Sequence, residues 1–479
     1  MQILIWSFFM SRFLQEGDVR PFGIRDKIGY LFGDFGNDFT FILSSSFLLK
    51  FYTDVMGVSA GIVGLVIMLS RFVDAFTDVT MGRICDRSRS TRHGKFKPWL
   101  RRMAGPVAIS SFLMYQYSIA DADMWIKISW LVVTYLLWGS IFYTSVNIPY
   151  GSMASAISAD PEHRQSLSTW RSMGATFAGA IIGAGVPLFV YNETQVNGKT
   201  VAILDGKAFT IAAGILSLLA VGAYMLCFYL TTERVKVPDM HPSEHRSIGA
   251  MLSSAFKNRA LLSMIVASVV MLMAQLTMQQ MANYVYPNYY GNYGAMTLST
   301  LAMVLAMVFA ATVVKPLTRK LGKAEISIGA NLIAAGVSGA LFIIRPESVW
   351  TFVALQLLMW LGLGIFTMVS WAIITDVIDH SEIINGVRED GSIYAMYSFA
   401  RKLGQSLSAG FVGLLLTVIG YSDETAFSES VREGIFNIAT LVPAIGFLLL
   451  ALILWFWYPL HKKTVERNVK MLEEKRKMN

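Results

Sequence analysis

The sequence predicts an all-α membrane protein whose helices, about twelve in number, form two pseudo-symmetric halves of six. Three observations support this prediction. Of the 479 residues, 54% are hydrophobic and only 15% are charged, too few to cover a soluble protein of this length. Apolar stretches of about 20 residues, the length that crosses a bilayer core, recur along nearly the whole chain. The basic residues behind the net charge of +8 collect in short links between these stretches, which argues against a nucleic-acid partner.

The twelve spans are expected in two sets of six. They lie at residues 27–53, 58–82, 98–120, 124–154, 166–190, 208–231, 258–287, 295–314, 324–344, 349–379, 391–419 and 434–458. Basic segments follow the second, sixth, eighth and twelfth spans, beginning with RICDRSRSTRHGKFKPWLRR. All four follow even-numbered spans and therefore lie on one side, which the positive-inside rule identifies as the cytoplasm. Both termini are then expected in the cytoplasm, with the chain in the inner membrane of a bacterium.

The basic link after the sixth span divides the chain. A segment reading DRSRSTRHGK after the second span has a shorter counterpart, KPLTRKLGK, after the eighth, which supports two related halves. The predicted parts are a leader (1–26), an N-terminal six-helix bundle (27–231), a linker (232–257), a C-terminal six-helix bundle (258–458) and a basic tail (459–479). Two such halves place a substrate site between them near the bilayer midplane. We expect the chain to act as a monomer in the lipid bilayer.

Several carboxylates fall within the first two spans, where an ionisable group costs ~2.5–3.5 kcal/mol or more and is a functional candidate. Asp34 and Asp38 are four residues apart, hence on one helix face. In the second span, Arg71, Asp74 and Asp78 share a stripe. A structural ion pair with Arg71 would explain one of these acids but not both. Two neighbouring carboxylates in low dielectric need a proton or a metal ion, so the pair is a natural site for a coupling cation.

Other polar residues lie deep in later spans. Asn147 precedes Pro149, which either kinks the fourth span or frees a backbone carbonyl to bind a cation. Arg171 in the fifth span and Lys402 in the eleventh have no acid nearby in the sequence, so each needs a carboxylate on another helix or a hydrated cavity. Lys402 could instead snorkel to the membrane surface, and its neighbour Arg401 is the better candidate for snorkelling.

The seventh span carries amides and a phenol that suit sugar hydroxyls, although the same groups could serve helix packing. These residues are Gln275, Gln279, Gln280, Asn283 and Tyr284. The chain has no GxxxxGKS phosphate loop, no nucleophile–base constellation and no cysteine cluster. We therefore expect no enzyme activity, no ATP-driven pump and no cofactor.

Four stretches resemble the glycoside–pentoside–hexuronide:cation symporters, a family of the major facilitator superfamily that includes the melibiose permease. They read GDFGNDFTF with FYTDVMG, RFVDAFTDVTMGRICDRSRSTRHGKFKPW, VNIPYGSMASAISADPEHRQSLSTWR and TDVIDHSEIINGVREDGSIYAMYSFARKLGQSL. The likeness covers about residues 25–420. It implies the major facilitator fold and the import of a sugar or glycoside together with H⁺ or Na⁺ by alternating access.

The resemblance also implies roles for single residues. Asp74 and Asp78 would bind the cation, and would be its metal ligands if it is Na⁺. From its position before Pro149, and not from the resemblance, we expect Asn147 to lend an oxygen to the same cation. Asp38 and Arg171 would bind the sugar, and Asp34, Gln279 and Tyr284 are further substrate candidates. Lys402 would face the cation site, and Gly82-x-x-x-Asp86-Arg87 matches the superfamily's cytoplasmic gating loop, which gives Asp86 and Arg87 a gating role. Arg71 is a further coupling candidate because it shares the helix stripe of Asp74 and Asp78, and not because of the resemblance.

Two positions depart from the melibiose permease. Asn147 replaces an aspartate, which leaves two acids and an amide and slightly favours H⁺ over Na⁺ as the coupling ion. Gly151 replaces a tryptophan, so galactosides need not be the substrate. Because Arg171 and Lys402 could bind an anion, an acidic or sulfonated sugar is one option. The alternative function is an uncoupled facilitator or a lipid-type carrier on the same fold.

Overall fold

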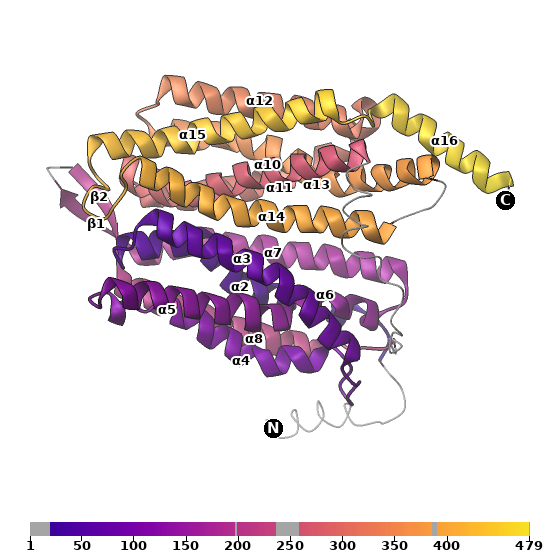
Figure 1. Ribbon diagram of the computed structural model, residues 1–479, viewed down its shortest axis with the longest axis horizontal. Helices are drawn as coiled ribbons and strands as arrows, with labels where there is room; N and C mark the ends of the chain where they lie inside the picture. The colour runs from indigo at the N-terminus through magenta and orange to yellow at the C-terminus, as the bar shows by residue number, and fades with distance from the viewer. Residues whose placement is uncertain (1–19, 197–198, 236–257, 386–389, 479) are drawn as a thin grey trace, which may run out of the picture.

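The computed structural model describes residues 20–196, 199–235, 258–385 and 390–478. The N-terminal half contains α2 (Ile24–Asp54), α3 (Ala60–Arg87), α4 (Lys97–Leu113), α5 (Met124–Leu136), α6 (Thr144–Ile157), α7 (Pro161–Val190) and α8 (Gly206–Leu230). The C-terminal half contains α10 (Arg259–Tyr284), α11 (Tyr293–Leu321), α12 (Lys323–Ile344), α13 (Val349–Asn385), α14 (Asp390–Val418) and α15 (Glu429–Leu452). The tail forms α16 (Lys462–Met478) (Figure 1).

Short elements join or extend these helices. A 3₁₀ turn, η1 (Tyr117–Ile119), follows α4, and three π-helical turns are η2 (Leu137–Tyr143), η3 (Val285–Tyr289) and η4 (Ile453–Trp457). The link between α7 and α8, expected only as a loop, forms an antiparallel hairpin of β1 (Tyr191–Val196) and β2 (Lys199–Leu204). The tail from 459 onward is mostly helical, and the predicted leader and linker lie largely outside the described residues.

The helices match the predicted spans closely. Within the described ranges, nine helices are long and apolar enough to cross a membrane. The three further spans correspond to α4, which has 17 residues, and to α2 and α14, which carry several charged residues along their length. α4 also ends at Leu113, before the predicted end at 120. The chain is therefore a multi-pass membrane protein, and the count of twelve stays a prediction.

The two halves repeat the same helix pairings. The first helix of each half packs against the fifth and sixth, as α2 does with α7 and α8, and α10 with α14 and α15. Glycines on α2 permit this approach: a Cβ on Gly29 would lie 2.7 Å from Leu230, and one on Gly36 would lie 2.7 Å from the Tyr224 ring. Between the halves, α3 packs on α14 and α11 packs on α7, a pairing that pseudo-twofold symmetry predicts.

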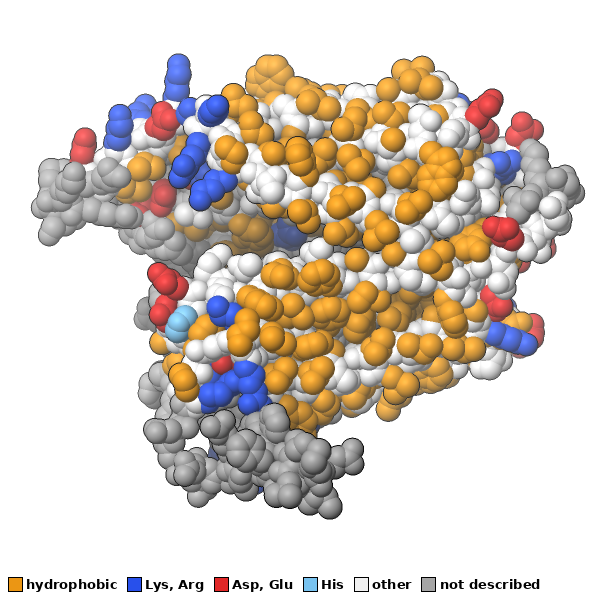
Figure 2. All heavy atoms as spheres, turned by 180° about the vertical axis from the view of Figure 1, so that it is seen from behind, with side chains coloured by type: hydrophobic (Ala, Val, Ile, Leu, Met, Phe, Trp, Pro, Cys, Tyr) orange, Lys and Arg blue, Asp and Glu red, His pale blue; other side chains and the backbone are white. Residues whose placement is uncertain are grey.

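The halves meet most closely at the end of the bundle that carries β1 and β2, here called the hairpin end; the opposite end, which carries α16, is the tail end (Figure 1). Near the hairpin end, Thr297 of α11 donates a hydrogen bond to the carbonyl of Ala184 (2.8 Å). About midway along α14, Ser406 donates one to the carbonyl of Met68 of α3 (2.8 Å). Figure 2 shows the halves in contact over this part and a hollow between them nearer the tail end.

A buried group of charged and aromatic residues, here called the Lys50 cluster, also joins the halves at the hairpin end. It consists of Lys50, Asp54, Tyr284, Asn288 and Tyr421. Lys50 of α2 is 1% exposed and lies 2.6 Å from Asp54. Its Nζ donates to Asn288 Oδ1 and to the Tyr421 hydroxyl, both at 2.7 Å, and lies 4.4 Å from the Tyr284 ring. Tyr421 in turn donates to Asp54 (2.8 Å). Charged groups of one half are thus satisfied by polar groups of the other.

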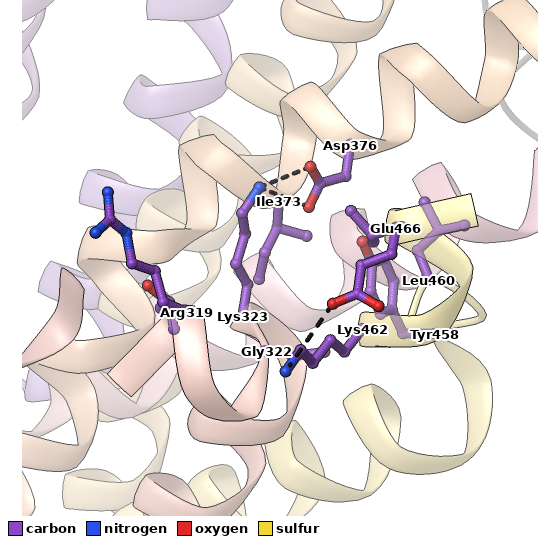
Figure 3. Close-up of a pocket in the computed structure, with 12 residues that line it drawn as sticks. Arg319, Gly322, Lys323, Ile373, Asp376, Tyr458, Leu460, Lys462 and Glu466 are labelled. Carbon is purple, nitrogen blue, oxygen red and sulfur yellow. Dashed lines mark hydrogen bonds and ion pairs between the residues drawn. The ribbon is translucent and has the colours of Figure 1, made fainter. Parts of the chain in front are cut away.

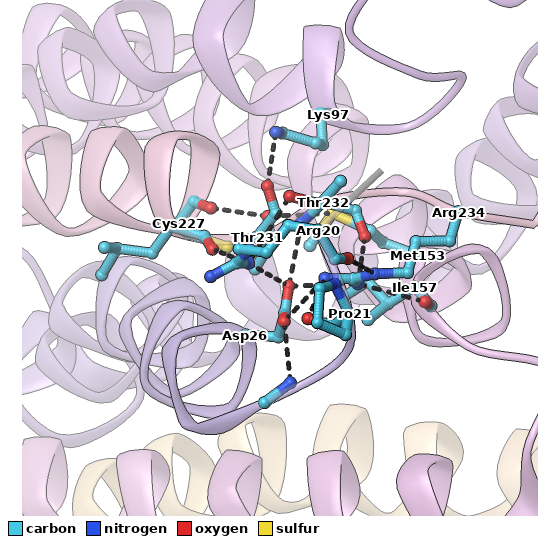
Figure 4. A network of polar contacts seen from close by, with 12 residues as sticks. Arg20, Pro21, Asp26, Lys97, Met153, Ile157, Cys227, Thr231, Thr232 and Arg234 are labelled. Carbon is cyan, nitrogen blue, oxygen red and sulfur yellow. Dashed lines mark hydrogen bonds and ion pairs between the residues drawn. The ribbon is translucent and has the colours of Figure 1, made fainter. Parts of the chain in front are cut away.

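At the tail end, a second network organises the N-terminal half by itself (Figure 4). The fully buried carboxylate of Asp26 accepts hydrogen bonds from Arg20 (2.7 Å), Arg234 (2.9 Å) and the backbone of Thr232 (3.1 Å). Lys97 at the start of α4 donates to the carbonyl of Thr231 (2.6 Å). The residues that follow α8 are therefore fixed to this half before the link crosses to the other.

Candidate functional site

The carboxylates Asp74 and Asp78 of α3 lie against the fourth membrane-crossing segment. Ser140 donates to Asp74 Oδ1 at 2.5 Å, and Thr144 donates to Asp78 Oδ1 at 2.8 Å. Ser140 belongs to the π-helical turn η2, a distortion that is frequent at functional sites. The arrangement offers two carboxylates and two hydroxyls, all oxygen groups that can hold a proton or ligate a small hard cation.

The same pair contacts the other half of the molecule. Lys402 of α14 forms an ion pair with Asp78. Arg71, on the same stripe of α3, places its guanidinium 4.7 Å from the ring of Phe41 rather than in an ion pair with Asp74. Asp78 is therefore the carboxylate that forms a direct ion pair with the other half.

A second polar group lies within the N-terminal half, where α2 and α7 meet. Arg171 donates from Nε to Asp34 Oδ1 at 3.0 Å, and its guanidinium lies 5.1 Å from the ring of Tyr150. Asp34 is almost fully buried, whereas the Arg171 side chain is 40% exposed. Asp38 is half-buried one turn further along α2, and no described residue donates a hydrogen bond to its carboxylate. Asp38 is thus available as an acceptor for ligand hydroxyls.

Asn147 lies between these two groups. Its Oδ1 is 3.5 Å from the amide nitrogen of Asn37 on α2, and the Asn37 oxygen accepts from the Tyr224 hydroxyl (3.0 Å). In this conformation the amide of Asn147 therefore faces the α2 side and not Asp74 or Asp78. Tyr30 and Tyr150 stack at 4.6 Å and complete an aromatic wall beside Arg171.

The remaining candidates lie in different places. Gln279 is half-buried on α10, and Tyr284 is committed to the Lys50 cluster at the hairpin end. Arg87 is exposed at the end of α3, and the side chain of Asp86 lies outside what the structure describes. Neither Tyr284 nor Arg87 is brought to the carboxylate pair.

Two cavities bear on ligand binding. The smaller, of about 40 Å³, lies between the halves and is lined by residues of α2, α3, α5, α10 and α14, among them Arg71, Gln280 and Gln405. It has room for a few water molecules and not for a sugar. The larger, of about 210 Å³, lies at the tail end between the α11–α12 turn, α13 and α16. Figure 3 shows its polar lining taken up by internal pairs, including Lys323 with Asp376 (2.6 Å).

Two findings go beyond the sequence-based expectations. Ser140 and Thr144 are site residues that the sequence-based expectations do not include, although they are spaced four residues apart like the carboxylates that they contact. Arg401 was expected to snorkel to the surface; instead its Nη1 is buried, and its guanidinium lies 5.7 Å from the ring of Trp371 on α13. The reason is that α13 covers this side of α14, which local sequence cannot reveal.

Comparison with known proteins gives consistent results. The family model described as MFS/sugar transport protein matches residues 29–462. The chain is 30% identical over 460 residues to a glucuronide carrier protein homolog of Escherichia coli, covering 95% of this chain and 96% of that protein. It is 29% identical over 438 residues to the inner membrane symporter YicJ of Escherichia coli, covering 91% and 92%.

Among solved structures, a D-xylose–proton symporter superimposes with a TM-score of 0.59 at 13% identity, covering 91% of this chain and 96% of that one. This likeness shows the major facilitator fold alone. Neither the family nor the fold is that of an enzyme. The chain belongs to the MFS sugar transport protein family, as its resemblance to the glycoside–pentoside–hexuronide:cation symporters predicts.

Proposed function

We propose that this protein is a secondary active symporter that imports a sugar or glycoside into the cell together with H⁺. The tail end faces the cytoplasm, both termini are cytoplasmic, and the protein lies in the inner membrane. The names of its relatives, a glucuronide carrier homolog and an inner membrane symporter, support the substrate class and the location. The basic links, which all follow even-numbered spans, support the orientation.

The observation that carries the proposal is the contact of Asp78 with Lys402 across the two halves. With the cation absent, Lys402 compensates Asp78. A proton on Asp78 removes that attraction and frees the halves to rearrange around a bound sugar, which couples the two binding events. Na⁺ would fit the same oxygen groups, but a proton needs only one carboxylate and no complete ligand shell.

The sugar is proposed to bind against Asp38, Arg171 and the adjacent tyrosines. It would reach them through the hollow at the tail end in this conformation, and through a corresponding opening at the hairpin end in the opposite conformation. Asp38 supplies an unoccupied acceptor for hydroxyl groups, and Arg171 supplies charge-assisted donors. An uncoupled facilitator or lipid-type carrier would gain nothing from two costly carboxylates at the interface between the halves. The coupled reading is therefore preferred.

The test is uptake into proteoliposomes under an imposed pH gradient, with a panel of labelled neutral and acidic methyl glycosides. Wild type should accumulate at least one of them above its external concentration. Asp74→Asn and Asp78→Asn should abolish accumulation but retain exchange of internal for external sugar. Asp121→Asn, an exposed carboxylate outside the site, is the matched control and should behave like wild type. Accumulation that persists in both Asp74→Asn and Asp78→Asn would refute the coupling role.

A further inference from the structure

Arg401 is a charged side chain in the middle of α14 that the transport mechanism above does not use. The residue is half-buried, and its Nη1 is buried without a hydrogen-bond partner among the described residues. A buried guanidinium nitrogen that makes no hydrogen bond loses the solvation it had in water. Such groups are rare in folded proteins and call for an explanation, of which a missing ligand is one.

The neighbouring cations differ from Arg401 in this respect. Arg171 contacts Asp34 and Lys402 contacts Asp78, so each has a carboxylate partner. Arg401 forms no ion pair within the described part of the chain, and its contact is with the face of Trp371. A cation–π contact of this kind contributes only about 0.5–2 kcal/mol and leaves the hydrogen-bond donors free.

The position of Arg401 is right for a transported ligand. It is one helical turn from Gln405, which lines the cavity between the halves, and it is adjacent to Lys402, which reaches α3 of the other half. Trp371 stacks on Tyr394 with ring centroids 4.8 Å apart, and Tyr397 meets Trp371 edge-on at 4.9 Å. Trp371 is 38% exposed and Tyr394 is 54% exposed, so both retain accessible surface for a sugar ring.

The charges of the central helices point to the nature of the ligand. Apart from the ion pairs Lys50–Asp54 and Lys323–Asp376, each of which is neutral as a pair, the carboxylates of the candidate site are Asp34, Asp38, Asp74 and Asp78, and its cations are Arg71, Arg171, Arg401 and Lys402. Four negative and four positive side chains give these residues a net charge of zero. One coupling cation with a neutral sugar would leave a net charge of +1 in the closed site, whereas one cation with a singly anionic sugar leaves zero. Uncompensated charge in low dielectric is costly, so the second combination is favoured.

We propose that Arg401 binds the anionic group of an acidic sugar, a carboxylate or a sulfonate, while Trp371 and Tyr394 contact its ring. The inference rests on the proposed function and narrows its substrate class. The guanidinium fork matches a planar carboxylate or two sulfonate oxygens, and the unpartnered Nη1 gains its hydrogen bond when the ligand binds. Asp38 and Arg171 of the other half then receive the hydroxyl groups.

The experiment compares three ligands that differ at one carbon: methyl β-D-glucuronide, methyl β-D-glucoside, and the glucoside with a sulfonate in place of its C6 hydroxyl. Dissociation constants are measured by calorimetry on the purified full-length protein in lipid nanodiscs. Wild type should bind one or both anionic ligands at least tenfold more tightly than the neutral glucoside. Comparison of the glucuronide with the sulfonate shows which of the two anionic groups the protein binds more tightly.

The variants are Arg401→Gln, Arg401→Lys and the control Arg319→Gln, an exposed arginine at the tail end. Arg401→Gln should weaken binding of the anionic ligand about 10- to 150-fold, as expected for loss of a charge-assisted hydrogen bond, and leave glucoside binding unchanged. Arg401→Lys should recover part of the loss. Thermal unfolding of each variant shows whether the fold is kept. If Arg401→Gln is misfolded, the role of Arg401 is tested with Arg401→Lys, by the ratio of its affinities for the anionic ligand and the neutral glucoside.

The outcomes separate the two proposals. If wild type transports the neutral glucoside with H⁺ and Arg401→Gln keeps every binding constant, the symport proposal stands and the role of Arg401 is refuted. If wild type binds an anionic ligand but Arg401→Gln binds it equally well, the anion lies elsewhere and the role of Arg401 is again refuted. If wild type binds none of the three ligands, the acidic-sugar proposal is refuted. The symport proposal is then tested separately, by uptake of the panel of neutral and acidic methyl glycosides into proteoliposomes.

Discussion

Replacement of Lys50 by Met should open the hairpin end of the molecule. The substitution keeps the length of the side chain but removes two charge-assisted hydrogen bonds to the other half, those to Asn288 and Tyr421, each 2.7 Å long. It also leaves Asp54 without its cation at 2.6 Å. Each of these hydrogen bonds contributes about 1.5–3 kcal/mol net of the water that replaces it when the end opens. Losing both therefore destabilises the closed form by about 3–6 kcal/mol, which shifts the conformational equilibrium about 10²- to 10⁴-fold.

The assay follows alkylation of a cysteine at Ser45, which lines the cavity between the halves, in a chain whose buried Cys85 and Cys227 are replaced by Ala. A membrane-impermeant maleimide applied to intact cells should react faster when Lys50 is Met. The alkylation rate of the double variant with Asp54→Asn and Lys50→Met should fall between those of wild type and of Lys50→Met alone, because no uncompensated carboxylate remains.

The matched control is Lys127→Met, a lysine of the same end that donates to the carbonyl of Met56 within one half (2.9 Å). It should leave the alkylation rate unchanged. An unchanged rate in a folded Lys50→Met variant would show that the Lys50 cluster does not hold this end closed.

Three further outcomes follow from the site and the topology. Thr144→Val removes the hydroxyl that donates to Asp78 at 2.8 Å and stabilises the ionised carboxylate, so it should lower the proton concentration needed for half-maximal uptake, whereas Thr144→Ser should behave like wild type; equal pH profiles for both would contradict the contact. Arg171→Ala should abolish sugar binding and lower the unfolding temperature, because it leaves the buried Asp34 uncompensated, and Arg171→Ala with Asp34→Asn should recover stability but not binding. A cysteine at Asn192 in β1 should be labelled by impermeant reagents in intact cells and one at Lys470 in α16 should not; the reverse pattern would invert the proposed orientation.

Most of the fold was predictable because a membrane imposes one requirement on every span: about 20 apolar residues whose backbone bonds are made within the helix. The exceptions have physical reasons. The hairpin of β1 and β2 consists of two six-residue strands outside the apolar spans, too short to separate from a loop by pattern. The early end of α4 reflects a 3₁₀ turn at Tyr117–Ile119, which interrupts an apolar stretch that sequence alone treats as continuous.

Site residues were predictable from the sequence where a charged side chain stands in an apolar span. They were not predictable where the role of a residue depends on which side chain of another helix it contacts. Asp74 and Asp78 are conspicuous in an apolar span, and the structure places Asp78 in an ion pair with Lys402. Tyr284 has the composition of a sugar-binding residue but lies against Lys50, which comes from a helix more than two hundred residues away in the sequence. Arg401 differs from Lys402 by one position, about 100° around the helix, and therefore meets α13 instead of α3.

The central claim is that a proton enters with the sugar through Asp78. The most direct measurement records the pH of a lightly buffered suspension of de-energised cells when an anionic or neutral methyl glycoside transported by the wild type is added. Wild type should produce a transient alkalinisation that a protonophore abolishes, and Asp78→Asn should produce none while still binding the sugar. Sugar entry without alkalinisation, stimulated by Na⁺ at constant pH, would contradict proton coupling and assign the pair to Na⁺.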